Sequence, residues 1–228
     1  MADRTVLVSG GTGGLGTAVV DAFADRGWRV VVPHLSPGGT LREGVERVTA
    51  DLTDPDDVAR AVRAAVGDAG APLRAVAHLV GGYAGDQPVA STPLGDFELQ
   101  FERNLRPAYL VCQAVLPRLA AAGGGAICCV SSRAALHPFA GAAGYCASKA
   151  ALITFARVVA REGAADGVRC NVVLPSQIAT PRMLADTPPE QHHALVPPEE
   201  VAAVIRFLCG EESAPVSGAA VPVYGSAA

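Results

Sequence analysis

Two side chains four residues apart, Tyr145 and Lys149, are the best suited in this sequence to move a proton. Lys149 is the only lysine, against 17 arginines. Arginine cannot lose its proton in a protein, whereas the pKa of a lysine shifts readily. If the segment from Tyr145 to Arg161 is helical, the two side chains share one face, and the ammonium favours the phenolate of a tyrosine whose pKa is ordinarily about 10. The pair predicts acid–base catalysis, although an ordinary pair on a solvated helix face is the structural alternative.

Two further polar residues stand where they could serve the same reaction. Ser132 follows an apolar run, 126–131, that is typical of a buried strand, and its hydroxyl could hydrogen-bond a substrate oxygen beside the Tyr145 hydroxyl. Asn104 lies within a long helical pattern from Asp96 to Ala122, where asparagine is unfavourable. It either bonds backbone and water inside the protein or faces a cavity.

A glycine-rich stretch near the N-terminus indicates a dinucleotide-binding loop. The apolar run 5–9 is followed by glycines between positions 10 and 16, and a helical pattern then runs from about Thr17 to Arg26. Glycines let the backbone approach a pyrophosphate, and the helix N-terminus offers N–H groups and a positive dipole. A flexible glycine-rich turn is the weaker alternative, because both flanks fit.

The end of the next predicted strand, 29–33, favours NADP(H) over NAD(H). Many dinucleotide folds place an acid there for the ribose hydroxyls of NAD. This chain has His34 and Ser36 instead, with Arg42 further on. The missing carboxylate removes repulsion against a 2′-phosphate, which these three side chains could contact. The alternative is that His34 is simply a surface residue.

Composition excludes several functional classes. The chain has 228 residues, is 50% hydrophobic and carries a formal net charge of −4, which fits one α/β domain (1–228) and argues against nucleic-acid binding. No apolar run approaches the ~20 residues that span a bilayer, and the N-terminus lacks a signal-peptide pattern. Six cysteines without CxxC spacing predict buried thiols in a reducing compartment, with no metal site. We therefore expect a cytoplasmic protein that does not bind membranes.

Strands and helices alternate along the whole chain, which predicts a doubly wound α/β Rossmann fold with about seven mostly parallel strands. Asp54 and Pro55 are a strong helix start, and Gly81 follows a predicted fourth strand at 74–80. The proline-rich segment 176–198 predicts a short lid or substrate loop. The remaining predicted elements are strands at 45–49, 126–131, 168–174 and 219–224 and helices from Asp54, at 96–122, 145–161 and 199–209.

Taken together, these motifs resemble the short-chain dehydrogenase/reductase family over essentially the whole chain. The stretch 9–16 is similar to the family's TGxxxGxG loop with Ser for Thr, and 171–175 followed by Ile178 and Thr180 resembles the segment that holds the nicotinamide carboxamide. The resemblance implies a catalytic tetrad of Asn104, Ser132, Tyr145 and Lys149. Together with the glycine loop and the end of the strand at 29–33, the resemblance predicts these cofactor contacts: Ser9, Gly10, Gly14, Leu15, Gly16, His34, Ser36, Asp51 (on the adenine amine), Leu52, Gly81, Tyr145, Lys149, Pro175, Ile178 and Thr180.

The resemblance also implies an activity, the interconversion of a carbonyl and an alcohol by hydride transfer, with Tyr145 as acid and base. Reduction of an imine or an activated C=C bond, or a non-catalytic sensor or scaffold, is the alternative. A homodimer or homotetramer is expected, with the helices at Asp96 and Tyr145 forming one interface. Candidate substrate-pocket residues are Tyr83, Arg133, His137, Phe139 and Met183. Arg133 either receives an anionic group of the substrate or pairs with an acidic neighbour or solvent.

Three features depart from the family pattern. The motif NNAG after the fourth strand is replaced by the sequence from His78 to Gly81, so only the glycine remains. His78 either replaces the first asparagine as a bridging group or is a satisfied core histidine. The expected PG after the sixth strand is Pro175-Ser176, and the lid between Thr180 and Glu199 is short. A more open pocket, or one completed by a neighbouring subunit, would follow.

Overall fold

A computed structural model describes residues 2–35, 41–85 and 87–225 of the chain. Seven strands form one sheet in the order β3-β2-β1-β4-β5-β6-β7, and every neighbouring pair is parallel. The prediction of a doubly wound fold is confirmed, and the sheet is parallel throughout. The strands are β1 (Thr5–Ser9), β2 (Arg29–His34), β3 (Glu46–Thr49), β4 (Leu73–His78), β5 (Gly125–Val130), β6 (Val168–Pro175) and β7 (Ala220–Val223).

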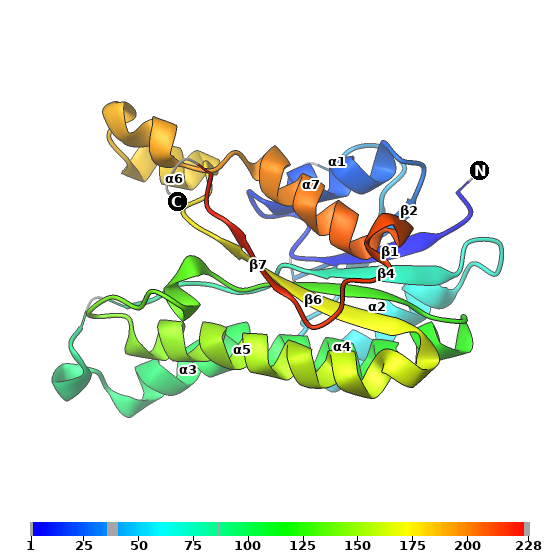
Figure 1. Cartoon of the computed structure of the whole chain (residues 1–228), viewed down its shortest axis with the longest axis horizontal. Coiled ribbons are helices and arrows are strands. Elements are labelled where there is room, and N and C mark those ends of the chain that lie inside the picture. Colours follow the sequence, from blue (N-terminus) through cyan, green and yellow to red (C-terminus); the bar gives the residue numbers. More distant parts are fainter. Residues whose placement is uncertain (1, 36–40, 86, 226–228) are drawn as a thin grey trace.

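Helices cover both faces of the sheet, as Figure 1 shows: α1 and α7 lie on one side, and α3, α4 and α5 on the other. One buried cluster fills the space between the sheet and α2, α4 and α5, and a second lies under α1 and α7. The helices are α1 (Gly16–Ala24), α2 (Pro55–Val66), α3 (Leu94–Asn104), α4 (Arg106–Ala121), α5 (Ala143–Glu162), α6 (Pro181–Asp186) and α7 (Pro198–Cys209).

The helix start at Asp54 shows how local sequence determines an element. The Asp54 carboxylate accepts hydrogen bonds from the backbone N–H groups of Asp56 (2.9 Å) and Asp57 (3.0 Å), and Pro55 occupies the first helical position. Both features satisfy or remove N–H groups that a helix N-terminus leaves unpaired. The apolar face of α2 is buried as its spacing indicates.

The predicted single helix from Asp96 to Ala122 is wrong in one respect, because the structure divides it into α3 and α4 at Leu105. Pro107 lies in the first turn of α4. A proline has no N–H to donate to the preceding turn, and its ring clashes there, so one helix ends and another begins. The break places Asn104 at the last position of α3 and not in mid-helix.

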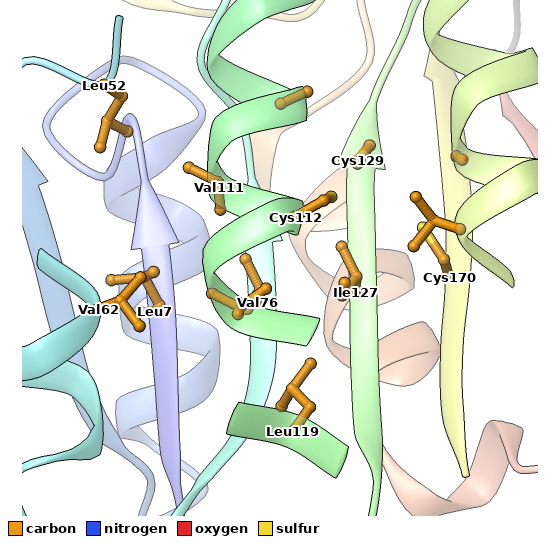
Figure 2. Close-up of a cluster of buried hydrophobic side chains, with 14 of the residues drawn as sticks. Leu7, Leu52, Val62, Val76, Val111, Cys112, Leu119, Ile127, Cys129 and Cys170 are labelled. Carbon is orange, nitrogen blue, oxygen red and sulfur yellow. The ribbon is translucent and has the colours of Figure 1, made fainter. Parts of the chain in front are cut away.

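All six cysteines are free and buried, as predicted. Cys112 of α4, Cys129 of β5 and Cys170 of β6 belong to the cluster drawn in Figure 2, where they fill space among Val and Leu side chains. No group of side chains in the described ranges is arranged to hold a metal ion. Among the helices described, none is long and apolar enough to cross a membrane.

Candidate active site

The glycine loop lies where the strand order reverses, between β1 and β4. Ser9 ends β1 and stands in register with His78, which ends β4. The Ser9 hydroxyl is 2.9 Å from His78 Nδ1 and accepts a hydrogen bond from the Leu79 N–H at 3.2 Å. His78 is therefore a bridging group between two strand ends, while its Nε2 has no partner among the described residues. Burial lowers its pKa to about 4, so this bridge is made by the neutral ring.

The loop geometry fits a pyrophosphate. Gly10 has φ +74°, which favours glycine, and a Cβ on Gly16 would lie 2.1 Å from the Gly10 carbonyl oxygen. Leu15, which precedes α1, has an apolar side chain that cannot cap the helix N–H groups. The turn is thus tight, closely packed and open to an anion at the N-terminus of α1.

The predicted NADP contacts are only partly described. His34 ends β2, whereas Ser36 lies outside the described residues. Arg42 forms ion pairs with Asp25 and, at 3.6 Å, with Asp21, both on or just after α1. The carboxylates offset the charge of Arg42, so the structure weakens its case as the cation for a 2′-phosphate.

Asp51, the predicted partner of the adenine amine, follows β3. Its Oδ1 accepts hydrogen bonds from the N–H and hydroxyl of Thr53 at 2.8 and 2.7 Å. These bonds fix the carboxylate in a local turn at the sheet edge. The adjacent Leu52 is 5% exposed and belongs to the core.

Tyr145 lies in the first turn of α5, close to Ser132. The Ser132 hydroxyl accepts a hydrogen bond from the Ala134 N–H at 3.2 Å, at the start of a short 3-10 turn after β5. Burial raises the pKa of Tyr145 above its ordinary value, and the nearby Ser132 side chain partly offsets that rise. Both side chains are only partly buried, so a substrate can reach them.

Lys149 is buried, and its ammonium donates a hydrogen bond to the Val130 carbonyl at 3.0 Å. Burial lowers its pKa from 10.5 to about 8. The expected lowering of the Tyr145 pKa by Lys149 is not seen, because desolvation of the phenol is the largest influence and raises that pKa. In this arrangement Tyr145 is held in its protonated form.

Asn104 joins the catalytic candidates into one network. Its side-chain amide pairs with both backbone groups of Gly82 (2.9 and 3.1 Å) and donates to the Ser148 hydroxyl at 3.1 Å. Ser148 in turn donates to the Tyr145 carbonyl at 2.9 Å. Of the two alternatives for Asn104, bonding to backbone is the one observed. Sequence reasoning missed Ser148, although a serine three residues after Tyr145 on a buried helix face was a usable signal.

Gly81 marks the point where this network converges. A Cβ on Gly81 would lie 2.6 Å from Asn104 Oδ1 and 2.8 Å from Lys149 Nζ. The two side chains therefore approach the same spot from α3 and α5. A side chain at this position would force Asn104 or Lys149 to move.

Aromatic side chains line the approach to Tyr145. The rings of Tyr83 and Tyr145 meet edge to face at 5.1 Å, and Phe139 lies 6.2 Å from Tyr83. The Arg133 guanidinium stands 5.0 Å from the Tyr224 ring, and the His137 ring lies 6.3 Å from it. The structure thus places Arg133 and His137 against the C-terminal segment; Tyr224 was not anticipated from sequence.

The lid segment carries the last predicted contacts. Pro175 ends β6, Ile178 forms a parallel bridge with Val196, and Thr180 caps α6, the helix on which Met183 lies. A Cβ on Gly14 would lie 2.7 Å from Thr180 Cβ, so the lid touches the glycine loop. The segment that follows β6 and the glycine loop therefore lie against each other.

Comparison with known proteins shows the family of this chain. A family model described as short chain dehydrogenase matches residues 4–191. The chain belongs to the short-chain dehydrogenase family. This short-chain dehydrogenase is 34% identical to 2-(R)-hydroxypropyl-CoM dehydrogenase of Xanthobacter autotrophicus over 98% of each chain. The protein is accordingly an NAD(P)-dependent oxidoreductase that acts on alcohol or carbonyl groups, which confirms the predicted reaction class.

Two solved structures share the fold. A 3-ketoacyl-(acyl-carrier-protein) reductase from Brucella melitensis, complexed with NADH, superposes with a TM-score of 0.89 at 23% identity and covers 99% of this chain and 98% of its own. ElxO with NADP bound gives 0.90 at 22% identity, with the same coverage. At these identities the likeness concerns the fold of this short-chain dehydrogenase and not its cofactor.

Proposed function

We propose that this short-chain dehydrogenase uses Tyr145 to transfer a proton to or from the oxygen of a small carbonyl or alcohol substrate, with NADP(H) as cofactor. One observation carries the proposal: hydrogen bonds run from Asn104 through Ser148 to the helix turn that carries Tyr145, beside Ser132, and Lys149 Nζ approaches the same spot as Asn104 at the Gly81 backbone. A bound nicotinamide cofactor supplies or accepts the hydride. Residues 1–228 would form one domain, and 176–198 its lid.

Each residue has a distinct part in this proposal. The raised pKa of Tyr145 favours the protonated phenol, which is the form that donates a proton to a carbonyl oxygen. Ser132 orients that oxygen and stabilises the charge that develops on it. Lys149 contributes a positive charge at the buried end of the site. Asn104 holds the Gly81–Gly82 turn against Lys149 and Ser148.

The variant Tyr145→Phe tests the proposal. It removes the hydroxyl but keeps the ring contact with Tyr83, so we expect loss of turnover of at least about a hundredfold with nearly unchanged cofactor affinity. Tyr109→Phe is the matched control, because it removes a hydroxyl from a half-exposed tyrosine on α4 and keeps the ring; its oligomeric state is compared with that of the wild type, since Tyr109 lies on the face proposed below for assembly. Turnover retained in Tyr145→Phe would contradict the mechanism.

The preference for NADP(H) rests on the end of β2, where His34 stands in place of an acid. Titrating NADPH and NADH side by side into the purified protein tests it, and we expect tighter NADPH binding. In His34→Asp the added carboxylate should repel a 2′-phosphate and reverse the order. Tighter NADH binding by the unchanged protein would contradict the preference and leave the roles of the tetrad untouched.

Other parts of the proposal concern substrate and assembly. Reduction of an imine or an activated C=C bond would use the same groups, and a substrate panel separates these reactions. Binding of cofactor without any turnover would favour a sensor or scaffold.

We further propose a homo-oligomer built on the α4–α5 face, where the rings of Tyr109 and Phe155 pack at 6.0 Å. We also propose a cytoplasmic location, which is consistent with six free cysteines.

A further inference from the structure

Three arginines meet at the end of the sheet opposite the active site. The adjacent strands β1, β4, β5 and β6 all begin at this edge. Arg4 immediately precedes β1, and Arg74 and Arg169 are the second residues of β4 and β6. In Figure 1 this is the end where the N-terminus lies, far from α6 and the C-terminus. Because ligands of parallel sheets normally bind at the carboxyl ends, the cofactor does not account for this cluster.

The arginines line a cavity of about 330 Å³. That size is at the lower end of the range for small-molecule sites, ~300–1,000 Å³. Glu211 is the one acidic side chain in the lining that the structure describes, so the wall carries an excess of positive charge. The other lining residues are Trp28, Gly123, Gly124, Gly125, Gly167, Cys209, Gly210 and Ala214.

Glycine turns form one wall of the cavity. Gly123, Gly124 and Gly167 all have positive φ, and a Cβ on Gly124 would lie 2.6 Å from the Gly167 carbonyl oxygen. The turns that precede β5 and β6 therefore pack directly against each other. The three glycines contribute no side chain to this wall of the cavity.

The hydrogen bonds of the three arginines differ. Arg169 is fully engaged, because it donates to the carbonyls of Leu208, Gly210 and Val216 and to the Ser213 hydroxyl at 2.8–3.1 Å. Burial lowers its pKa, which indicates a poorly hydrated charge.

Arg74 and Arg4 use fewer of their donors. Arg74 donates to the Gly124 carbonyl at 3.1 Å. Arg4 lies 4.6 Å above the Trp28 ring, and its buried Nε has no hydrogen-bond partner in the described part of the chain; the Asp3 carboxylate is 3.6 Å away. Arg4 and Arg74 therefore keep guanidinium N–H groups that are not used in bonds within the described part of the chain, and these donors are available to an acceptor in the cavity.

We propose that this cavity binds a small phosphate-bearing anion, with Arg4 and Arg74 as direct donors and Arg169 as a fixed charge. Guanidinium groups present planar pairs of donors that match phosphate oxygens, and such charge-assisted hydrogen bonds are stronger than neutral ones. The site is separate from the glycine loop, so the short-chain dehydrogenase would bind this anion and its cofactor at the same time.

The only tryptophan of the chain, Trp28, lines the cavity and reports on it. We would titrate inorganic phosphate and pyrophosphate into the full-length protein, follow Trp28 fluorescence and calorimetric heat, and use chloride at equal ionic strength as the reference. The expected result is a saturable signal with phosphate that persists when NADPH is saturating. Absence of the signal, or its loss by competition with NADPH, would overturn the proposal, because competition would place the anion on the cofactor loop.

Variants locate the binding further. Arg4→Met and Arg74→Met should each weaken phosphate binding about tenfold, since each removes a charge-assisted donor. Arg182→Met is the matched control: it removes the same charge from the lid, where Arg182 is 93% exposed, and should leave the affinity unchanged. Arg4→Lys retains the charge but not the planar donor pair, so its affinity for phosphate should lie between those of the wild type and Arg4→Met. Equal affinity in wild type, Arg4→Met and Arg74→Met would refute the site.

Discussion

Replacing Lys149 with methionine is expected to change the way in which the free energy of unfolding depends on pH. The side chain is 5% exposed, and burial lowers its pKa from 10.5 to about 8. Between these two values the unfolded chain holds a proton that the folded chain has released. Stability therefore rises with pH across this window, and it is lower below pH 8, where the folded protein carries a buried ammonium.

The magnitude follows from the two pKa values, which differ by about 2.5. At 1.36 kcal/mol for each pKa unit, Lys149 adds about 3 kcal/mol to the free energy of unfolding as pH rises from about 8 to 10.5. The variant Lys149→Met lacks this contribution. Groups that do not interact with Lys149 are present in both proteins and cancel in the difference, whereas Cys129, whose pKa Lys149 lowers, titrates differently in the variant.

Reversible denaturant unfolding of wild type and Lys149→Met at several pH values between 7 and 10.5 measures this difference directly. The difference in the free energy of unfolding between the two proteins should be constant below about pH 7.5. Above that pH, the free energy of unfolding of the wild type should rise by about 3 kcal/mol relative to that of Lys149→Met. Arg161→Met is the control, because it removes an exposed cation from the same helix that does not titrate in this range. If the free energy of unfolding had the same pH dependence in wild type and Lys149→Met, the claim that burial lowers the pKa of Lys149 would be refuted.

Two further substitutions test the site and the fold. Gly81→Ala should lower kcat about tenfold or more, because the added Cβ would displace Asn104 and Lys149. Gly82→Ala is the control: a Cβ at Gly82 meets open space, so kcat should be nearly unchanged. Equal kcat values for the two variants would contradict the convergence of side chains at Gly81. Asp54→Ala should lower the free energy of unfolding by about 1 kcal/mol through loss of the α2 cap, and Asp54→Asn should restore most of it; an unchanged stability in Asp54→Ala would show that the cap is dispensable.

Local signals in the sequence were sufficient for most of the secondary structure, for the fold class and for the resemblance to the family. Alternating apolar runs and helical patterns predicted the parallel sheet, and Asp54-Pro55 predicted the start of α2. These signals come from interactions between residues close together in the sequence, so they are visible in the sequence pattern itself. The same kind of reasoning missed the break at Leu105, because the helical spacing of apolar residues continues through it while Pro107 ends the hydrogen-bond ladder.

Contacts between distant segments could be decided only by the tertiary structure. His78 bonds Ser9 across 69 residues and Asn104 bonds Ser148 across 44, and no local pattern specifies either pair. The direction of the Tyr145 pKa shift was also misjudged from spacing alone, because burial of the phenol, and not its separation from Lys149 along a helix, is the largest influence on that pKa. The sequence by itself was enough to name the candidate side chains for the chemistry. The packing of α3, α5 and the strand ends decided their partners and their charge, since burial and long-range hydrogen bonds exist only in the folded chain.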